Sequence, residues 1–269
     1  MLKLHDLLPS VVEVARSAGL EIMDVYARDF GVEEKADRSP LTAADLRSQA
    51  RIIEGLNALA PATPILSEES AIVPFAERAR WREYWLVDPL DGTREFVSRN
   101  PEFTVNIALV RDHRAVLGVV HVPAQRLDYY GCEGVGAFRR SSGGSAAPVR
   151  VLPQAASPIR VVGSKSHRGD SLDALLKRIG PHELKAIGSS LKFCLVADGA
   201  ADFYPRLGPT SEWDTAAGQA VLECAGGFVI DLEGQPLRYN TRSALLNPHF
   251  IAYADASRDW LRLVAGNAA

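Results

Sequence analysis

Cysteine is scarce in this sequence, with three residues among 269. Cys132, Cys194 and Cys224 lie far apart, are odd in number and form no CxxC pair. That spacing favours free thiols in a reducing compartment. The chain also lacks an apolar leader and any uninterrupted apolar run near the roughly 18 residues of a membrane-spanning helix. We therefore expect a soluble cytoplasmic protein without a transmembrane segment.

An excess of charge of one sign is lacking too. The 30 Lys and Arg residues against 33 Asp and Glu give a net charge of −3, and the charges are spread along the chain. Such a balance provides no basic surface for a nucleic-acid polymer. With 47% hydrophobic residues, the chain suits one large domain or two closely packed ones. A small molecule is the expected partner, and a homodimer stays open.

Apolar spacing predicts helices first and strands next. The spacing is helical from about Leu4 to Phe30, with an early Pro9, and Thr42 opens a second helix. Short strands are expected at 63–67, 84–88, 103–110, 115–122 and 126–131, with a hairpin across 111–114. The run SSGGSAAP at 141–148 predicts a flexible surface loop, near which the chain divides.

Beyond that loop, strands and helices alternate. A strand is expected at 159–163 and helices at 171–179, 189–197 and 215–225, the last closed by Gly226 and Gly227. This order predicts an α+β half over residues 1–150 and an α/β half over 151–269.

The run WLVDPLDGTREF at 85–96 carries the chemistry. Asp88 follows an apolar, strand-like run, and Pro89 prevents the strand from continuing with full hydrogen bonding. Magnesium is usually held by one or two carboxylates and by phosphate oxygens, which suits Asp88 and Asp91. Gly92 lets a ligand approach the main chain, and a helix opening near Thr93 would direct N–H groups at an anion. Taken alone, however, these residue types also make an ordinary β-turn.

Other acidic residues could likewise have a purely structural role in place of metal binding. Glu68 and Glu69 follow a strand-like run and could be solvated loop residues. Asp214 could be the N-cap of the helix that follows it, and Asp45 could complete a capping box with Thr42. Carboxylates that converge would repel each other and raise their own pKa values unless a cation compensated them. Sequence spacing does not show such convergence.

The ordered motifs resemble the inositol monophosphatase superfamily, and within it the 3′(2′),5′-bisphosphate nucleotidases of the CysQ type. The resemblance covers almost the whole chain. It is carried by KADRSPLTAAD at 35–45, LSEES at 66–70, WLVDPLDGTREFVSRNPEFTVNIALV at 85–110, GSKSH at 163–167 and the run from GSSLK to ECAGG at 188–227. It implies the layered αβαβα fold of these sugar phosphatases, a magnesium requirement and lithium sensitivity.

Site residues follow from the same resemblance. The implied ligands of two or three Mg²⁺ ions are Glu68, Asp88, the carbonyl oxygen of Leu90, Asp91 and Asp214. The implied catalytic residues are Asp45, Thr93 and Glu68, with Asp45 and Thr93 activating the attacking water. The implied substrate-binding residues are Glu68, Leu90, Asp91, Gly92, Thr93, His167, Ser189, Lys192, Arg206 and Asp214. The first half would thus hold the metal and catalytic groups, and the second half would add Asp214 and the nucleotide contacts.

The resemblance implies hydrolysis of adenosine 3′,5′-bisphosphate to AMP and phosphate, by in-line attack of an activated water. Lys192 and Arg206 suit the phosphate that is not cleaved. Hydrolysis of 3′-phosphoadenylyl sulfate and a role in sulfate assimilation belong to the same expectation. Alternatives are an inositol monophosphatase, a fructose 1,6-bisphosphatase or a metal-dependent phosphate sensor without activity. Peripheral association with the inner membrane stays open.

Overall fold

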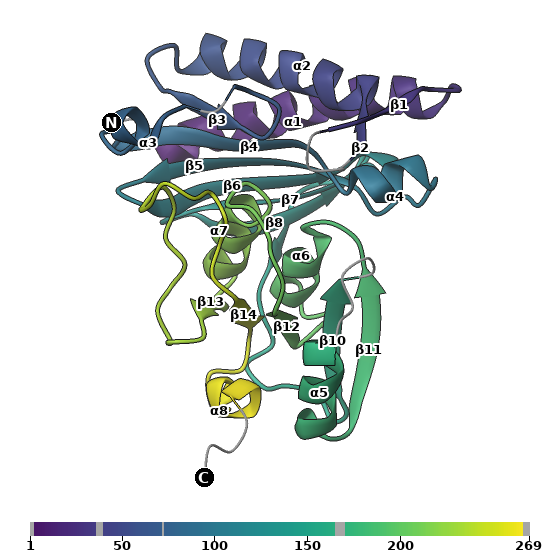
Figure 1. Ribbon diagram of the computed structural model, residues 1–269, viewed down its shortest axis with the longest axis vertical. Coiled ribbons are helices and arrows are strands. Elements are labelled where there is room, and N and C mark those ends of the chain that lie inside the picture. The colour runs from purple at the N-terminus through teal and green to yellow at the C-terminus, as the bar shows by residue number, and fades with distance from the viewer. Residues whose placement is uncertain (1–2, 36–39, 72, 165–169, 266–269) are drawn as a thin grey trace.

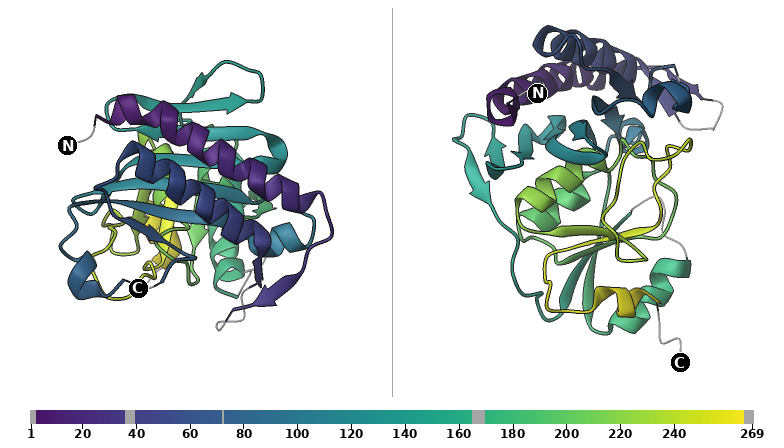
Figure 2. Two further views of the ribbon diagram at one scale, coloured as in Figure 1. Left: turned by 90° about the horizontal axis from the view of Figure 1, so that it is seen from above. Right: turned by 90° about the vertical axis from the view of Figure 1, so that its left-hand side faces the viewer.

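Two amphipathic helices at the start of the chain form the outermost layer. In the computed structural model, which describes residues 3–35, 40–71, 73–164 and 170–265, α1 spans Leu4–Tyr26 and α2 spans Ala43–Leu59. They lie side by side across a sheet (Figure 2, left) and bury one apolar face on it. The predicted first helix thus ends at Tyr26 and not at Phe30. The chain then pairs β1 (Val32–Glu34) with β2 (Pro40–Thr42).

A seven-stranded sheet forms the second layer, in the order β3-β4-β5-β6-β7-β8-β9. Only β3 and β4 are parallel, and every other neighbouring pair is antiparallel. The strands are β3 (Ile65–Ser67), β4 (Glu83–Asp91), β5 (Thr104–Arg111), β6 (Arg114–Val122), β7 (Leu127–Cys132), β8 (Gly136–Ser141) and β9 (Ala147–Val149). The five predicted strands and the predicted hairpin are all present.

Strand β4 runs further than predicted. Its pairing with β5 shifts register between Asp88 and Asp91, so Pro89 interrupts the ladder but does not end the strand. The helix expected near Thr93 is α4 (Thr93–Val97). Two short helices lie at loops of this half, α3 (Phe75–Arg78) and the 3₁₀ turn η1 (Pro123–Gln125).

The third layer consists of α6 (Leu191–Ala197) and α7 (Ala216–Cys224), packed between two sheets (Figure 1). Glycines allow this close packing. A Cβ placed on Gly118 would lie 2.3 Å from the carbonyl oxygen of Ala217, and one on Gly218 would lie 2.5 Å from the Phe193 ring. Apolar residues of both halves therefore form one continuous core around these helices.

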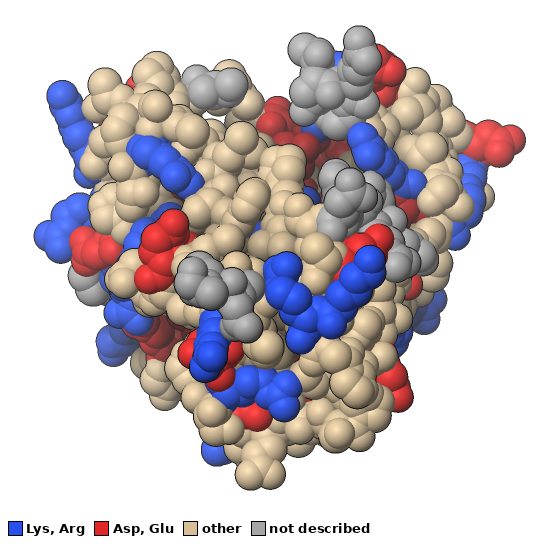
Figure 3. All heavy atoms as spheres, turned by 60° about the horizontal axis from the view of Figure 1, so that its bottom comes forward, with Lys and Arg blue, Asp and Glu red and all other residues tan. Residues whose placement is uncertain are grey.

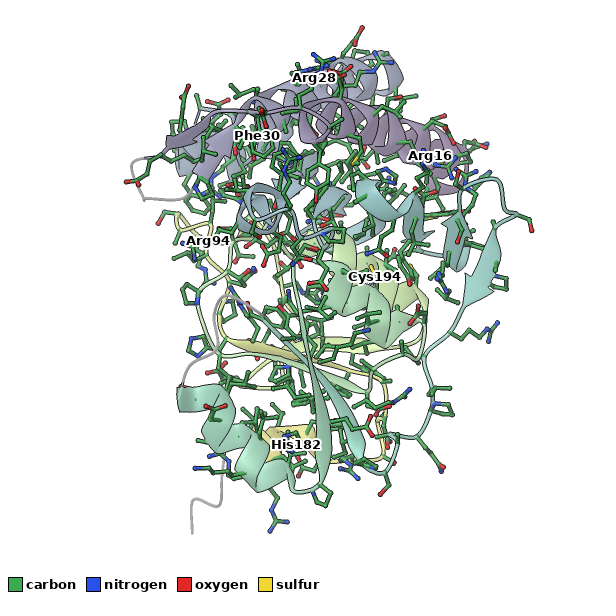
Figure 4. The ribbon with its side chains drawn as sticks, turned by 90° about the vertical axis from the view of Figure 1, so that its right-hand side faces the viewer. Arg16, Arg28, Phe30, Arg94, His182 and Cys194 are labelled. Carbon is green, nitrogen blue, oxygen red and sulfur yellow. The ribbon has the colours of Figure 1, made fainter. Side chains whose placement is uncertain are left out.

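A mixed five-stranded sheet and two helices complete the fold. The strand order is β11-β10-β12-β14-β13, and β10 is parallel to β11 and β12 while β14 is antiparallel to β12 and β13. The elements are β10 (Ile159–Ser164), α5 (Asp170–Ile179), β11 (His182–Ile187), β12 (Phe203–Arg206), β13 (Phe228–Asp231), β14 (Phe250–Tyr253) and α8 (Trp260–Ala265). Figure 4 labels Cys194 in the middle layer and His182 near the outer one. The expected αβαβα layering is confirmed.

A buried ionic cluster holds α1 against the first sheet. The His121 ring nitrogen Nδ1 lies 2.7 Å from Asp128 Oδ1, and Arg16 Nη2 donates to Asp128 Oδ2 at 2.6 Å. Gly19 of α1 faces the imidazole, and a Cβ there would lie 2.4 Å from His121 Nε2. The helix can approach the sheet this closely only because Gly19 has no side chain.

We expect Gly19→Ala to lower the free energy of unfolding. Alanine favours a helix by up to about 1 kcal/mol over glycine, but overpacking costs ~1–3 kcal/mol, and His121 is tied to Asp128 and cannot yield freely. Urea denaturation measures the difference. Gly31→Ala is the matched control, because nothing lies within 4 Å of a Cβ there. Equal stability of Gly19→Ala and the wild type would contradict this packing.

Candidate active site

The predicted acidic residues meet at one end of the first sheet. Glu68 directly follows β3, Asp88 and Asp91 belong to β4, and Asp214 precedes α7 from the second half. Glu68, Asp91 and Asp214 line a cavity of about 650 Å³, and the buried Asp88 lies within electrostatic range of all three. Figure 3 shows Asp and Glu atoms recessed in a hollow near the top of the view. The convergence that sequence spacing could not show is therefore present.

Asp88 is the most deeply buried member of the cluster. It is 1% exposed, and its Oδ1 accepts a hydrogen bond from the Leu90 N–H at 3.0 Å. Burial and the negative charges of Glu68, Asp91 and Asp214 raise the pKa of Asp88 well above its usual range. An isolated anion at this position is unfavourable, which makes the position suitable for a cation ligand.

Glu68 faces a lysine from the β1–β2 connection. Lys35 Nζ donates to Glu68 Oε1 at 2.9 Å and also to Glu69 Oε1. Burial raises the pKa of Glu68 to about 7, although Lys35 acts in the opposite direction. The ammonium group thus partly compensates the acidic cluster on this side.

Asp91 and Asp214 are positioned mainly by residues of the second half. Asp91 Oδ2 accepts hydrogen bonds from the backbone N–H and the hydroxyl of Ser190, both at 2.6 Å. Asp214 Oδ2 accepts from Thr210 Oγ1 at 2.7 Å and from the Ser211 N–H at 2.9 Å. Burial and the charge of Asp91 raise the pKa of Asp214 to about 6.

The alternative that Asp214 is the N-cap of α7 is wrong. The alternative that Asp45 completes a capping box is correct, but Asp45 also has a second contact. Thr215, and not Asp214, occupies the N-cap of α7. Asp45 does complete the capping box of α2, accepting from the N–H and the hydroxyl of Thr42 at 2.8 Å each. Its other oxygen, Oδ1, accepts from Thr93 Oγ1 at 3.2 Å. The cap thus orients a buried carboxylate toward Thr93.

The chain turns sharply just before Thr93. Gly92 has φ 90°, a left-handed conformation that glycine adopts readily, and it precedes the five-residue helix α4. Gly92 and Thr93 both line the cavity, and Thr93 Oγ1 lies 3.2 Å from the carbonyl oxygen of Leu90. Glycine and threonine of the DGT run therefore border the acidic cluster directly.

Two buried cations line the same cavity as the acidic cluster. Lys192 is 5% exposed, donates to the carbonyl oxygens of Ile187 and Ser189, and has a pKa lowered to about 8 by burial. Arg206 is 9% exposed, and its Nε has no hydrogen-bond partner among the described residues. Ser189, with φ 46°, also lines the cavity. Buried cations with free donor capacity suit an anionic ligand.

His167 lies outside the described residues. Other residues at the site were not predicted, namely Lys35, Ser190, Asn106 and Thr210. Asn106 Nδ2 lies 3.2 Å from Asp91 Oδ2 and 2.8 Å from Ser190 Oγ. Ser190 directly follows Ser189 in the GSSLK motif, and that adjacency was the one available signal.

A buried arginine joins the two sides of the site behind the cavity wall. Arg78, at the end of α3, is 1% exposed and donates to Asn240 Oδ1 and to the carbonyl oxygen of Arg242. The Asn240 N–H donates to Glu212 Oε2 at 2.8 Å, two residues before Asp214. Arg78 therefore links the segment that follows Glu68 to the loop that carries Asp214.

The donor set fits magnesium. Among the described residues, no group of three or more His, Cys, Asp or Glu side chains is placed so that it could hold a metal ion. Glu68, Asp91 and Asp214 bond instead to Lys35, Ser190 and Thr210. The donors are nevertheless all hard oxygens, which Mg²⁺ prefers, and burial raises the pKa values of Glu68, Asp88 and Asp214, as expected where no cation compensates the cluster fully.

Solved structures share the fold around this site. CysQ from Bacteroides thetaiotaomicron, a bacterial member of the inositol monophosphatase family, aligns with a TM-score of 0.78 and 39% identity over 93% of this chain and 97% of that chain. An inositol monophosphatase from Anabaena sp. PCC 7120 aligns with a TM-score of 0.76 and 26% identity, covering 97% of this chain and 96% of that one. The fold and its acidic cavity thus define a layered phosphatase of the inositol monophosphatase type.

The sequence comparison gives the family directly. The family described as "Inositol monophosphatase family" matches residues 3–260. The 3′(2′),5′-bisphosphate nucleotidase CysQ of Salmonella typhimurium is 48% identical over 246 residues, which are 91% of this chain and 98% of that protein. This chain belongs to the inositol monophosphatase family, whose enzymes are metal-dependent phosphatases, generally with Mg²⁺.

We expect the stability of the metal-free chain to fall as pH rises. The pKa values of Glu68 and Asp214 in the folded chain, about 7 and about 6, lie above the ordinary values of 4.5 and 3.8. Protonation of these two groups contributes to the free energy of unfolding. The contribution is complete at pH values below their ordinary pKa values and is lost as pH rises through about 6 to 7. Denaturation with chelator should show this loss, and excess Mg²⁺ should reverse it at neutral pH.

The same measurement on Asp88→Asn tests whether Asp88 belongs to the cluster. Without the Asp88 carboxylate, the free energy of unfolding should fall less as pH rises, and added Mg²⁺ should increase it less. Asp112→Asn is the control, because Asp112 is an exposed turn residue with φ 46° that asparagine also tolerates. A gain with Mg²⁺ in Asp88→Asn equal to that of the wild type would rule out Asp88 as a metal ligand.

Proposed function

We propose that this chain hydrolyses adenosine 3′,5′-bisphosphate to AMP and phosphate, with magnesium as cofactor. The observation that carries the proposal is the pairing of an acidic cluster with two buried cations, Lys192 and Arg206, in one cavity of about 650 Å³. A monophosphate substrate needs one anion site, whereas a bisphosphate needs a second one beyond the metal. Similarity to nucleotidases of the CysQ type supports the same choice.

Glu68, Asp88, the carbonyl oxygen of Leu90, Asp91 and Asp214 would hold two or three Mg²⁺ ions. When bound, magnesium supplies Lewis-acid stabilisation of phosphoryl charge and lowers the pKa of water. Lys35 is bonded to Glu68 and lies at the edge of this ligand set, so its ammonium group would share the negative charge with the metal.

Asp45 and Thr93 are proposed to activate the attacking water. Thr93 donates its hydroxyl proton to the Asp45 carboxylate, which leaves the Thr93 oxygen free to accept a hydrogen bond from water in the cavity. The water oxygen attacks phosphorus while the water proton passes through Thr93 to Asp45. The bond from phosphorus to the sugar oxygen breaks, its electron pair stays on the sugar oxygen, and that oxygen takes up a proton from solvent water to become the hydroxyl of AMP. The backbone N–H groups of Gly92 and Thr93 would hold the phosphate during this step.

The second half is proposed to hold the rest of the substrate. Lys192 and Arg206 would neutralise the phosphate that remains on AMP, and Ser189 and His167 would contact the nucleotide. The same contacts would allow hydrolysis of 3′-phosphoadenylyl sulfate, consistent with a role in sulfate assimilation, and the metal site would be lithium-sensitive. Inositol 1-phosphate has no second phosphate for these cations to bind.

A panel of substrates tests this choice. With Mg²⁺ present, we expect phosphate release from adenosine 3′,5′-bisphosphate to exceed release from inositol 1-phosphate and fructose 1,6-bisphosphate in kcat/KM. Chelator should stop the reaction, and added Mg²⁺ should restore it. Faster turnover of inositol 1-phosphate would exclude the nucleotide as the preferred substrate, and absence of turnover on every compound would favour a sensor.

Asp45→Asn and Thr93→Val should lower kcat by roughly 10²–10⁴-fold, the usual contribution of a positioned acid–base group. Because neither residue is a proposed metal ligand, stabilisation by Mg²⁺ should remain. Thr63→Val, which lies outside the cavity, is the control and should leave kcat unchanged. Near-normal kcat in both site variants would contradict the assigned roles, and loss of Mg²⁺ stabilisation would indicate a metal-binding role.

A further inference from the structure

Glu95 is a buried carboxylate in the cavity that has no role in the proposed hydrolysis. It lies in α4, two residues after Thr93, and is 7% exposed. Neighbouring Arg94 also lines the cavity but is exposed, and Figure 4 shows it at the outer edge of the molecule. Buried carboxylates are normally matched by a donor or a cation. We therefore expect the Glu95 carboxylate to have a hydrogen-bond donor or a cation as a partner.

Two glycines place the Glu95 side chain within the cavity. A Cβ on Gly92 would lie 3.3 Å from Glu95 Oε2, and a Cβ on Gly188 would lie 2.7 Å from Glu95 Cγ. Gly92 belongs to the loop proposed to hold the cleaved phosphate, and Gly188 directly precedes Ser189 in the proposed nucleotide contacts. Glu95 thus lies at the junction of these two subsites, where the sugar of a nucleotide bisphosphate must pass.

Among the described residues, no side chain donates a hydrogen bond to the Glu95 carboxylate. Lys192 acts on it through charge, and the negative charges of Asp91 and Glu102 oppose that effect. The carboxylate therefore retains acceptor capacity on the cavity side. Because a negative group beside a phosphate is repulsive, its presence is favourable only where the ligand offers a hydrogen-bond donor.

We infer that Glu95 accepts a hydrogen bond from the sugar hydroxyl next to the cleaved phosphate, and so selects ribonucleotide over 2′-deoxyribonucleotide bisphosphates. In adenosine 3′,5′-bisphosphate, the 2′-hydroxyl is the free sugar donor and is adjacent to the 3′-phosphate. A carboxylate accepts from this hydroxyl and repels an additional phosphate in its place. The inference rests on the proposed function, because it takes Gly92 as the cleaved-phosphate subsite.

Comparison of two substrates that differ by one hydroxyl tests the inference. We would measure kcat/KM for adenosine 3′,5′-bisphosphate and for its 2′-deoxy analogue, with Mg²⁺, in the wild type, Glu95→Ala and Glu95→Gln. The wild type should prefer the ribonucleotide by about tenfold or more, as expected for a hydrogen bond to a charged group. Glu95→Ala should bring the ratio close to one, mainly through loss on the ribonucleotide.

Glu95→Gln keeps the shape of the side chain and a neutral acceptor, so its ratio should be intermediate. It also keeps the inference testable if Glu95→Ala fails to fold. Glu54→Gln, on the exposed face of α2, is the control and should keep the wild-type ratio. A wild-type ratio near one, or a ratio unchanged in Glu95→Ala or in Glu95→Gln, would overturn the inference while nucleotide hydrolysis itself stands. Failure of the wild type to hydrolyse either nucleotide would overturn the proposed function and this inference together.

Discussion

Mutual repulsion between buried carboxylates is the constraint on which the rest of this structure depends. Asp88, Glu68 and Asp214 are held near one another although the charges of Glu68 and Asp214 raise the pKa of Asp88, and the charge of Asp214 raises the pKa of Glu68. Such an arrangement persists only where surrounding packing and hydrogen bonds fix the backbone. The interrupted ladder of β4, the capping box of α2 and the Ser190 contacts all have this effect. The stability of the scaffold thus offsets the unfavourable free energy of holding these buried acidic groups together.

The same constraint explains why the site is divided between the halves of the chain. Asp91 belongs to the first sheet, but its carboxylate is oriented by Ser190, 99 residues later. Arg78 and Asn240 join segments 162 residues apart and tie the Glu68 side of the cavity to the Asp214 loop. Asp88 and Asp214 are fixed by neighbours in sequence, Leu90 and Thr210, but Asp91 depends on Ser190 of the second half. The geometry of the whole cluster therefore exists only when both halves are in place.

Much of the fold could be predicted from the local spacing of apolar residues, and the strands that were not predicted share a cause. Long apolar periodicity predicted α1, α2 and the strands from β3 to β7. Elements missed by that pattern are short or lie near sheet edges, such as β9, which is mostly exposed, and β12, which contains Pro205. Their positions depend on neighbours that are distant in sequence. Propensity alone carries little information about such segments.

Prediction of the site shows the same limit. The DPLDGT run identified Asp88, Asp91 and Thr93 by local chemistry, and the resemblance supplied Glu68 and Asp214. Lys35 and Asn106 lie within the motifs that carry the resemblance, but no role for them was predicted, because their contacts cross between elements. For Asp45, the capping-box interpretation is confirmed, and the second oxygen accepts from Thr93, while its part in activating water stays a prediction.

The shared middle layer has a consequence for how the chain is made. Helices α6 and α7 come from residues 191–224, yet they cover the inner face of a sheet completed by residue 149. During synthesis, side chains such as Val120, Leu127 and Tyr129 emerge well before the helices that bury them. The nascent first half therefore exposes an apolar surface until α6 and α7 have been synthesised and pack on it. During that interval the chain is prone to aggregation and needs chaperones.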